Sequence, residues 1–479
     1  MNKTDCQKHK PPTFRFKNVG PVKNAELELG DLTIIAGRNN TGKTYLAYTL
    51  YGFLKMWKRW LDTDALLALV TNDCVDFPDI YSITDKVNRE GRVSFPLDRK
   101  QFSRQQRTVI QELARNFSED ALSSVFSAYQ SDFHRSHLDV KPNEDISEGS
   151  HVVKEKIGES DSLSIEYDGS NVVVSTNKVK NQQLIPDLGL NIIHQYFLLL
   201  LHNQLPDPFI LSAERFGISL FYKELDFTKN QLVDLLQKLG ENKNTDRISP
   251  FLFVDRTTSR YALPIKDNID FTRDISDLQK RKSEIFESKL FDDIKDMMDG
   301  YYGSSSDDIR FISKTRKQEG KFNILLHLAS SSARELVDLY FFLKHVAKKN
   351  HLLIIDEPES HLDTSNQILL ARLLARCVRA GLKVLITTHS DYLIKEINNL
   401  VMLSRPFEDK EAVIKKLKYS PDDFLDSESV RAYVAEDNSL TRCDVDRFGI
   451  DMPVFDETID EINRVANDLA SRMSEDSEA

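Results

Sequence analysis

Two short motifs more than 300 residues apart constrain this chain more than any other feature of its sequence. The first, Gly37-Arg38-Asn39-Asn40-Thr41-Gly42-Lys43-Thr44, fits the P-loop pattern G-x-x-x-x-G-K-[ST] at every fixed position. The second is an apolar run from Leu352 that ends in two carboxylates, Asp356 and Glu357. A glycine loop of this kind cradles phosphates, and strand-end carboxylates suit magnesium. The pair therefore predicts a chain that binds ATP or GTP and hydrolyses it.

The residues around the first motif supply the strand and the helix that a P-loop requires. Leu32 to Ala36 is a continuous apolar run typical of a central strand, and residues 44–55 have the pattern of a helix. Backbone N–H groups at the start of this helix suit phosphate oxygens. We expect the nucleotide to contact Gly37, Arg38, Asn39, Asn40, Thr41, Gly42, Lys43, Thr44 and Tyr45.

Five side chains are predicted to carry the chemistry. Lys43 should reach the β- and γ-phosphates, and the Thr44 hydroxyl and Asp356 carboxylate should hold Mg²⁺. Glu357 is placed to polarise the attacking water as a general base. His389 follows another apolar strand, Val384 to Thr388, and is a candidate sensor of the γ-phosphate; a structural histidine is the alternative.

Composition limits the other classes of protein. The chain has 479 residues, a formal net charge of −11 and a hydrophobic fraction of 40%, which are ordinary values for a globular protein of two or three structural units. The acidic balance does not favour broad capture of nucleic acid. The four cysteines are scattered, and the most apolar stretch, Tyr196 to Leu201, is too short to span a bilayer. We therefore expect a cytoplasmic protein without a membrane segment.

The pattern along the chain predicts an α/β fold with a mixed central sheet, flanking helices and helical insertions. Residues 1–57 and 161–216 are expected to form one ATPase lobe, and residues 321–420 the second. Residues 58–160 are interpreted as a mostly helical insertion, residues 217–320 as a helical arm, and residues 421–479 as a helical tail. Within 161–216, Asp168-Gly169 between two alternating runs predicts a β-hairpin.

The order of these motifs resembles that of the ABC-type ATPase superfamily, which includes the SMC, RecF and double-strand-break-repair ATPases. Asp356-Glu357-Pro358-Glu359-Ser360-His361-Leu362-Asp363 resembles the Walker B and D-loop segment, Thr388-His389-Ser390 resembles the H-loop, and Phe16-Lys17-Asn18-Val19-Gly20 resembles the opening strand. The resemblance implies an ABC-type head fold and adds Asp363 to the expected nucleotide contacts.

The family's signature loop is rich in Ser and Gly and completes the ATP site of the opposite protomer. Here Ser331, Ser332 and Ala333 stand at those positions, and no glycine is present. A serine hydroxyl at a helix N-terminus can still face a γ-phosphate across a dimer. The resemblance therefore implies slow, oligomer-dependent turnover; an ordinary serine N-cap is the alternative.

Within the superfamily, three segments resemble the stand-alone ATPases of bacterial anti-phage systems: residues 356–362, 212–215 and 388–393. The similarity is greatest to AriA of the PARIS system, with PtuA of Septu as the alternative. OLD-family nucleases carry a Toprim domain after the ATPase. Asp444-Val445-Asp446 imitates its D-x-D motif, but the remaining chain is shorter than a domain of about 100 residues.

The resemblance implies a homo-oligomer, hexameric and built from ATP-sandwich dimers, that holds a separate AriB-like Toprim nuclease and releases it when a phage protein is sensed. A competing hypothesis is an SMC- or RecF-like ATPase that clamps DNA in repair. Small basic clusters would serve it, namely Arg99, Lys100, Arg104 and Arg107, and Lys314, Arg316, Lys317 and Lys321. Direct nucleic-acid binding is not favoured, because such runs are usually solvated faces.

Overall fold

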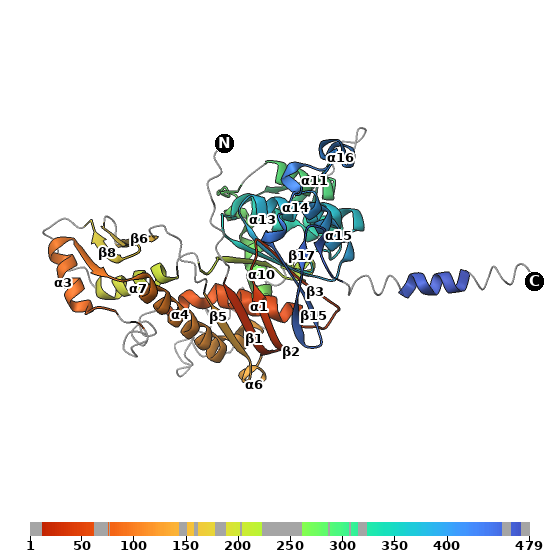
Figure 1. Cartoon of the computed structure of the whole chain (residues 1–479). Coiled ribbons are helices and arrows are strands. Elements are labelled where there is room, and N and C mark those ends of the chain that lie inside the picture. The colour runs from red at the N-terminus through yellow and green to blue at the C-terminus, as the bar shows by residue number, and fades with distance from the viewer. Residues whose placement is uncertain are drawn as a thin grey trace, which may run out of the picture.

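The computed structural model is built around one large central sheet with helices on both faces (Figure 1). It describes residues 12–61, 75, 77–142, 151–157, 161–177, 188–201, 204–222, 261–285, 288–305, 308–314, 323–452 and 461–470. The predicted mixed α/β fold with flanking helices is confirmed. Within these residues, none of the helices is long and apolar enough to cross a lipid bilayer.

The central sheet has nine strands in the order β5-β1-β2-β16-β15-β3-β14-β13-β9. Their bounds are β1 Thr13–Val19, β2 Val22–Glu28, β3 Leu32–Ala36, β5 His137–Lys141, β9 Pro208–Leu211, β13 Leu352–Asp356, β14 Lys383–Thr388, β15 Val430–Glu436 and β16 Ser439–Cys443. The five strands from β15 to β9 are parallel, and β5, β1 and β2 form an antiparallel extension. The carboxyl ends of all five parallel strands therefore lie on the same side of the sheet.

The parallel strands are buried on both faces, which explains their continuous apolar sequences. Successive residues point to opposite sides: Ile35 and Ile354 belong to one core cluster, and Ile34 and Ile355 to the other. The first cluster is covered by α1 (Lys43–Met56), α4 (Arg99–Asn116) and α7 (Leu188–Leu200). The second is covered by α11 (Ser288–Met298), α13 (Val337–His345), α14 (Thr364–Arg379) and α15 (Asp391–Met402).

Smaller sheets extend this body. The strands β4 (Arg92–Pro96), β6 (His151–Ile157), β7 (Asp161–Tyr167) and β8 (Asn171–Thr176) form a four-stranded sheet. The predicted hairpin is confirmed as β7 and β8, and Asp168 Oδ1 accepts hydrogen bonds from the backbone N–H groups of Ser170 and Asn171 at 2.9 and 2.7 Å. A three-stranded sheet contains β10 (Gly300–Ser305), β11 (Asp308–Ser313) and β12 (Asn323–Leu325).

The expectation of a helical tail over residues 421–479 was wrong for residues 430–443. They form β15 and β16, and β15 lies directly beside β3, the strand that leads into the glycine loop. The turn between them uses Asp437 and Asn438 with φ of 47° and 60°, the left-handed conformation of a tight hairpin. The β-branched and aromatic residues Val430, Tyr433 and Val434 favour the strand, and burial against β3 stabilises it.

Two other expectations can be compared with the structure. Where the structure describes residues 58–160, they are mostly helical, as expected, but they also contribute the strands β4, β5 and β6, and β5 pairs with β1 as an outer strand of the central sheet. Residues 217–320 contain no projecting arm within the part that the structure describes. There, α10 (Leu263–Leu278) and α11 pack on the body, with Ile275 and Ile294 in the core. The polar neighbours of these residues suggested a solvent-exposed arm, but burial of the apolar side chains stabilises packing against the body.

Candidate nucleotide site

The glycine loop lies between β3 and α1, as the sequence predicts. Gly42 has φ of 94° and precedes the first turn of α1, and Gly37 has φ of 145°. A Cβ atom at Gly37 would lie 2.5 Å from the carbonyl oxygen of Ala435 in β15. Both positions therefore require glycine, one for its backbone conformation and one also for the close approach of a neighbouring strand.

Lys43 is buried inside this loop. Its Nζ donates to the carbonyl oxygens of Gly37 at 2.8 Å and Arg38 at 2.7 Å. Burial lowers the pKa of Lys43, and the carboxylates of Glu357, Asp356 and Glu359 oppose that shift. The ammonium group is thus held where the loop curves, next to the acidic end of β13, which is the position that contact with a bound phosphate requires.

The remaining loop residues differ in exposure. Arg38, Asn39 and Asn40 are exposed, and the Thr41 hydroxyl donates to the carbonyl oxygen of Arg38 at 2.9 Å, which fixes the loop's curvature. Tyr45 lies in the first turn of α1, and its ring stacks on Phe126 with centroids 5.0 Å apart. The Tyr45 side chain is therefore used in packing at this helix end.

Asp356 ends β13 beside the first turn of α1. Its Oδ1 accepts hydrogen bonds from Thr44 Oγ1 at 3.2 Å and from Thr387 Oγ1. The residue is fully buried, and its Oδ2 has no hydrogen-bond partner within the described part of the chain. Burial raises the pKa of Asp356 to about 6. An orphaned buried carboxylate oxygen next to a hydroxyl fits a hard cation, so Thr44 and Asp356 could hold Mg²⁺.

Glu357 follows Asp356 in a strained conformation, with φ of 51°. A non-glycine residue in this region costs about 1–3 kcal/mol unless its surroundings impose it. Here the Glu357 N–H donates to the Thr387 carbonyl oxygen at 3.1 Å, and its own carbonyl oxygen accepts from Arg215 Nη2 at 2.8 Å. These two contacts hold the backbone so that the half-buried carboxylate stays beside the loop.

His389 and Glu359 complete the acidic side of the site. His389 Nδ1 lies 3.9 Å from Glu357 Oε1 and 3.3 Å from Glu359 Oε1. Glu359 is buried, and its Oε1 also accepts from Thr388 Oγ1 at 2.8 Å and from the His389 N–H at 2.7 Å. The structure therefore brings together five predicted residues, Lys43, Thr44, Asp356, Glu357 and His389.

The predicted signature residues do not join this group within a single chain. The helix α12 (Ser331–Glu335) is capped by Ser330, whose Oγ accepts from the Ala333 N–H at 3.3 Å. Ser331 and Ser332 are partly exposed, and among the described residues neither forms a hydrogen bond to the glycine loop. Asp363 likewise caps α14, accepting from the N–H groups of Ser365 and Asn366 at 2.9 and 3.1 Å.

Sequence reasoning left Arg215, Glu359 and Thr387 without a role at the site. Arg215 is buried, and its Nη1 donates to the carbonyl oxygens of Asp356 at 2.6 Å and Ser212 at 2.9 Å. The available signal was the polar residues at the ends of β9, β13 and β14, because the carboxyl ends of parallel strands lie side by side and bring such residues together.

A glycine loop between a strand and a helix, facing a buried strand-end carboxylate, defines a P-loop ATPase. The chain belongs to the family described as the AAA ATPase domain, which matches residues 13–394.

Solved structures of SMC heads show weak similarity. An SMC head bound to the C-winged helix domain of ScpA has a TM-score of 0.30 and 12% identity, over 90% of this chain and 95% of that chain. The SMC head domain from Thermotoga maritima has a TM-score of 0.29 and 11% identity, over 92% of this chain and 100% of that chain. An Smc head domain from Pyrococcus furiosus, with an extended coiled coil, has a TM-score of 0.31 and 10% identity, over 95% of this chain and 100% of that chain. No curated protein matches the chain.

Proposed function

We propose that the chain hydrolyses ATP with Mg²⁺ held by Thr44 and Asp356, with Glu357 as the general base and Lys43 and His389 at the γ-phosphate. The observation that carries this proposal is the fully buried Asp356, whose Oδ2 has no partner while its Oδ1 is bonded to Thr44. A bound Mg²⁺ would screen the charge of the β- and γ-phosphates. Glu357 then has only to orient a water and take its proton.

Turnover is proposed to require a second copy of the chain. Ser331 and Ser332 lie at the start of α12, are partly exposed and form no hydrogen bond to their own glycine loop among the described residues. The exposed Asp363 at the start of α14 is available to the same partner. In this arrangement each copy supplies α12 to the nucleotide of the other, and the oligomer is built from such dimers up to a hexamer.

For the cellular role we propose the sensor and scaffold of an anti-phage complex. In this role the oligomer holds a separate Toprim-type nuclease and releases it when a phage protein is sensed. The resemblance of residues 212–215, 356–362 and 388–393 to AriA-type ATPases supports this. So does the helix over residues 461–470, which lies apart from the body in Figure 1 and exposes Ile462, Val465 and Leu469 by 63%, 50% and 55%. These three apolar side chains follow a helical spacing that suits docking of another protein.

The experiment that tests the cellular role is co-expression of the chain with the protein encoded beside it. The complex is purified by a tag on this chain, and its mass is measured with and without ATP. A large assembly that contains a nuclease-like second protein is expected. A lone ATP-dependent dimer that carries no second protein would contradict the scaffold role while leaving ATP hydrolysis intact.

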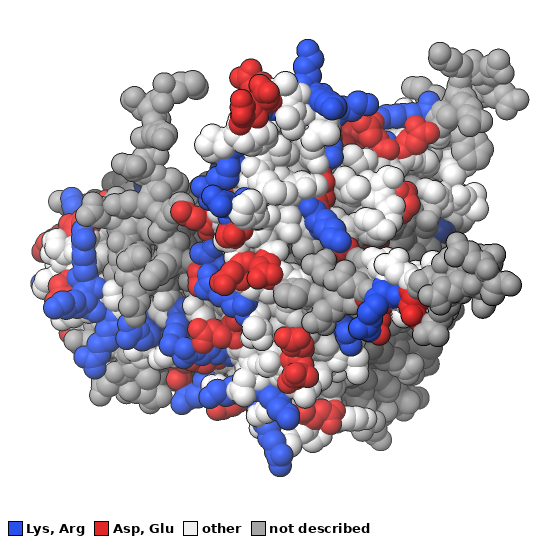
Figure 2. Space-filling view, turned by 45° about the vertical axis from the view of Figure 1, so that its right-hand side comes forward, with Lys and Arg blue, Asp and Glu red and all other residues white. Residues whose placement is uncertain are grey.

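One observation favours a second candidate, a DNA-clamping ATPase. Lys100, Arg104 and Arg107 lie on the exposed face of α4 at spacings of one helical turn, beside Arg99. In the view of Figure 2, Lys and Arg side chains gather at the left, whereas the rest of that face mixes both signs. In the other basic cluster, Lys314 pairs with Asp296 at 2.6 Å, and Arg316, Lys317 and Lys321 lie outside the described residues.

The two candidates differ in how binding depends on salt. Duplex DNA held by phosphate contacts on α4 should dissociate steeply as salt rises. Binding that is absent or independent of salt would reject the clamp. DNA binding that weakens steeply with salt, and that is lost when Lys100, Arg104 and Arg107 are changed to Glu, would favour the DNA clamp over the scaffold role.

A further inference from the structure

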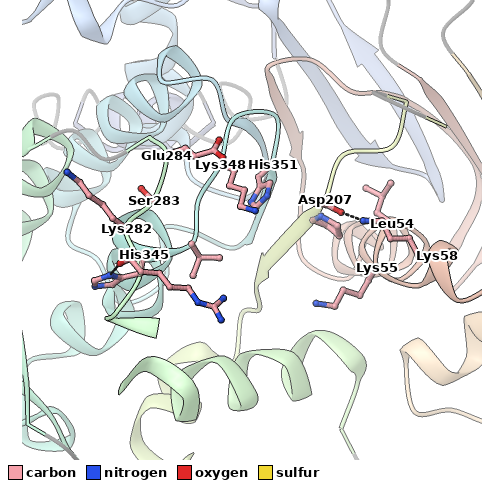
Figure 3. Close-up of a pocket in the computed structure, with 13 residues that line it drawn as sticks. Leu54, Lys55, Lys58, Asp207, Lys282, Ser283, Glu284, His345, Lys348 and His351 are labelled. Atoms are coloured by element: carbon pink, nitrogen blue, oxygen red, sulfur yellow. Dashed lines mark hydrogen bonds and ion pairs between the residues drawn. The ribbon is translucent and has the colours of Figure 1, made fainter. Parts of the chain in front are cut away.

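A cavity lies at the amino-terminal ends of β9 and β13, opposite the strand ends that face the glycine loop. Its volume is about 570 Å³, and its walls come from the end of α1, the start of β9, residues 281–284, the end of α13 and His351 (Figure 3). Pro208 begins β9 and His351 precedes β13, whereas the nucleotide site is built on the residue that ends β13. The two sites are therefore separated by the length of the strands.

The lining of this cavity is strongly cationic. Five lining residues carry a positive charge and two a negative charge; they are Lys55, Lys58, Arg281, Lys282 and Lys348, and Asp207 and Glu284. Lys58 pairs with Asp207 at 2.7 Å, and Lys55 pairs with Asp267 outside the cavity at 3.6 Å. Arg281 and Lys348 form no ion pair within the part of the chain that the structure describes. The cavity therefore holds positive charge that the described residues do not neutralise.

The dipoles of neighbouring helices explain the position of only some of these cations. Cations are favoured near a helix C-terminus, and Lys55 lies in the last turn of α1. Arg281, Lys282 and Lys348, however, lie outside helices. Figure 3 shows Lys282, Ser283, His345 and Lys348 along one wall, and Lys55, at the end of α1, and Lys58, in the turn that follows α1, along the facing wall. A ligand between these walls would meet cations on both sides.

Two buried polar atoms in the same wall have no partner among the described residues. They are Ser283 Oγ and His345 Nε2, on residues that are only 7% and 8% exposed. His345 Nδ1 lies 2.7 Å from the carbonyl oxygen of Arg281, so Nδ1 carries a proton and Nε2 is left facing the cavity. Unsatisfied buried polar atoms are costly. The Ser283 hydroxyl could donate to a phosphate oxygen of a ligand, and the unprotonated His345 Nε2 could accept from a ligand hydroxyl group.

We propose that this cavity binds a small phosphorylated ligand, with its phosphate oxygens between Lys348 and Arg281 on one wall and Lys55 and Lys58 on the other. Phosphate oxygens accept several charge-assisted hydrogen bonds at once, which suits a lining of ammonium, guanidinium and hydroxyl groups. The volume matches the range of about 300–1,000 Å³ that small-molecule sites occupy. This site is distinct from the glycine loop and does not depend on the proposed cellular role.

The test counts pyrophosphate sites on the full chain by equilibrium dialysis. Pyrophosphate is small enough for both sites, so the wild type is expected to bind two per chain. Lys43→Ala removes the glycine-loop site and should leave one. Lys348→Glu should also leave one, and in the Lys43→Ala background it should lower the remaining affinity by about tenfold or more, the factor expected for a lost charged hydrogen bond.

Lys349→Glu is the matched control. Lys349 is the next residue and is also exposed, but it does not line the cavity. Its substitution changes the net charge by the same amount as Lys348→Glu. Its pyrophosphate binding should equal that of the wild type, and Lys348→Arg should retain binding because it keeps the charge. Equal losses for Lys348→Glu and Lys349→Glu would overturn the proposal, as would a single pyrophosphate per wild-type chain.

A second arm distinguishes the source of the phosphate groups. A 5′-phosphorylated dinucleotide is compared with a duplex DNA of about two helical turns in the Lys43→Ala background. Binding of the dinucleotide that depends on Lys348 supports a small phosphorylated ligand. Duplex binding without dinucleotide or pyrophosphate binding would overturn it and assign the basic lining to a nucleic-acid backbone.

Discussion

Arg215 forms a buried ion pair with Glu335, and each residue is only 2% exposed. The same guanidinium group donates to the backbone carbonyl oxygens of Asp356 and Glu357. Glu335 is the last residue of α12, the helix that begins with the signature serines. One side chain therefore connects the helix that is proposed to face a second copy with the strand end that is proposed to hold Mg²⁺ and activate water.

Replacing Arg215 should destabilise the fold. Arg215→Ala leaves Glu335 buried without its partner and two carbonyl oxygens without their donor. We expect a loss of about 3 kcal/mol in the free energy of unfolding, at the low end for a broken buried pair, because Glu335 can take up a proton. Burial raises the pKa of Glu335 to about 7, which makes that protonation accessible. Urea denaturation measures the change.

Arg215→Lys is the matched control, since it keeps the charge but loses the planar fork. It should recover part of the stability and little of the ATP turnover, because the two carbonyl oxygens need donors in fixed directions. Unchanged stability in Arg215→Ala would show that the ion pair and the two carbonyl contacts contribute nothing to the fold.

Glu357→Gln should separate binding from hydrolysis. The amide keeps the size of the side chain and its place beside the glycine loop but cannot accept a proton from water. Turnover should fall by about 10²–10⁴, the usual contribution of a general base, while ATP affinity stays within a few fold. Single-turnover hydrolysis and a fluorescent nucleotide titration measure the two quantities. Wild-type turnover in this variant would refute the base assignment.

Ser332→Arg tests the contribution of a second copy. Ser332 is partly exposed at the start of α12 and forms no hydrogen bond to its own glycine loop among the described residues, so a large cation there should leave ATP affinity of an isolated chain unchanged. Turnover should be lost, and its dependence on protein concentration should disappear with it. If Ser332→Arg weakened ATP affinity in dilute protein as much as it lowers turnover, the site would be complete within one chain.

Stability should fall as pH rises because of buried carboxyl groups, two of which lie outside the glycine loop and the end of β13. Burial raises the pKa of Asp338 and of Glu335 to about 7, from ordinary values of 3.8 and 4.5. The folded state therefore keeps protons that the unfolded state releases. Their stabilising contribution is complete below about pH 4 and is lost as pH rises through about 7. Urea midpoints at about pH 5 and about pH 8.5 measure this loss.

Asp338→Asn isolates one of these groups. Its amide stays neutral at every pH and can still accept the hydrogen bond that Thr272 Oγ1 donates to Asp338 Oδ1 at 3.1 Å. The pH dependence should become shallower, with the remaining slope due to Glu335 and Asp356. Asp277→Asn, at an exposed position in α10, should leave the wild-type slope unchanged. An unaltered slope in Asp338→Asn would contradict the raised pKa.

The sequence by itself determined the P-loop, its strand and helix, and the acidic end of β13. Each of these depends on a local pattern: glycines where the loop curves, a lysine and threonine in fixed register, and apolar runs of strand length. Because parallel strands end at one edge, the sequence also indicated that Asp356, Glu357 and His389 should lie near the loop. The helix over residues 44–55 and the hairpin at Asp168 and Gly169 were predictable for the same local reason.

Only the tertiary structure decided what depends on contacts between distant residues. β15 lies beside β3, about 400 residues earlier in the chain, because buried apolar strands gain more from pairing in the sheet than from forming a tail. Arg215 meets Glu335 across the core, and Lys58 and the basic residues near His345 line one cavity whose walls come from four separate segments of the chain. Such pairs have no signature in local sequence, since their partners are chosen by the packing of the whole sheet and its helices.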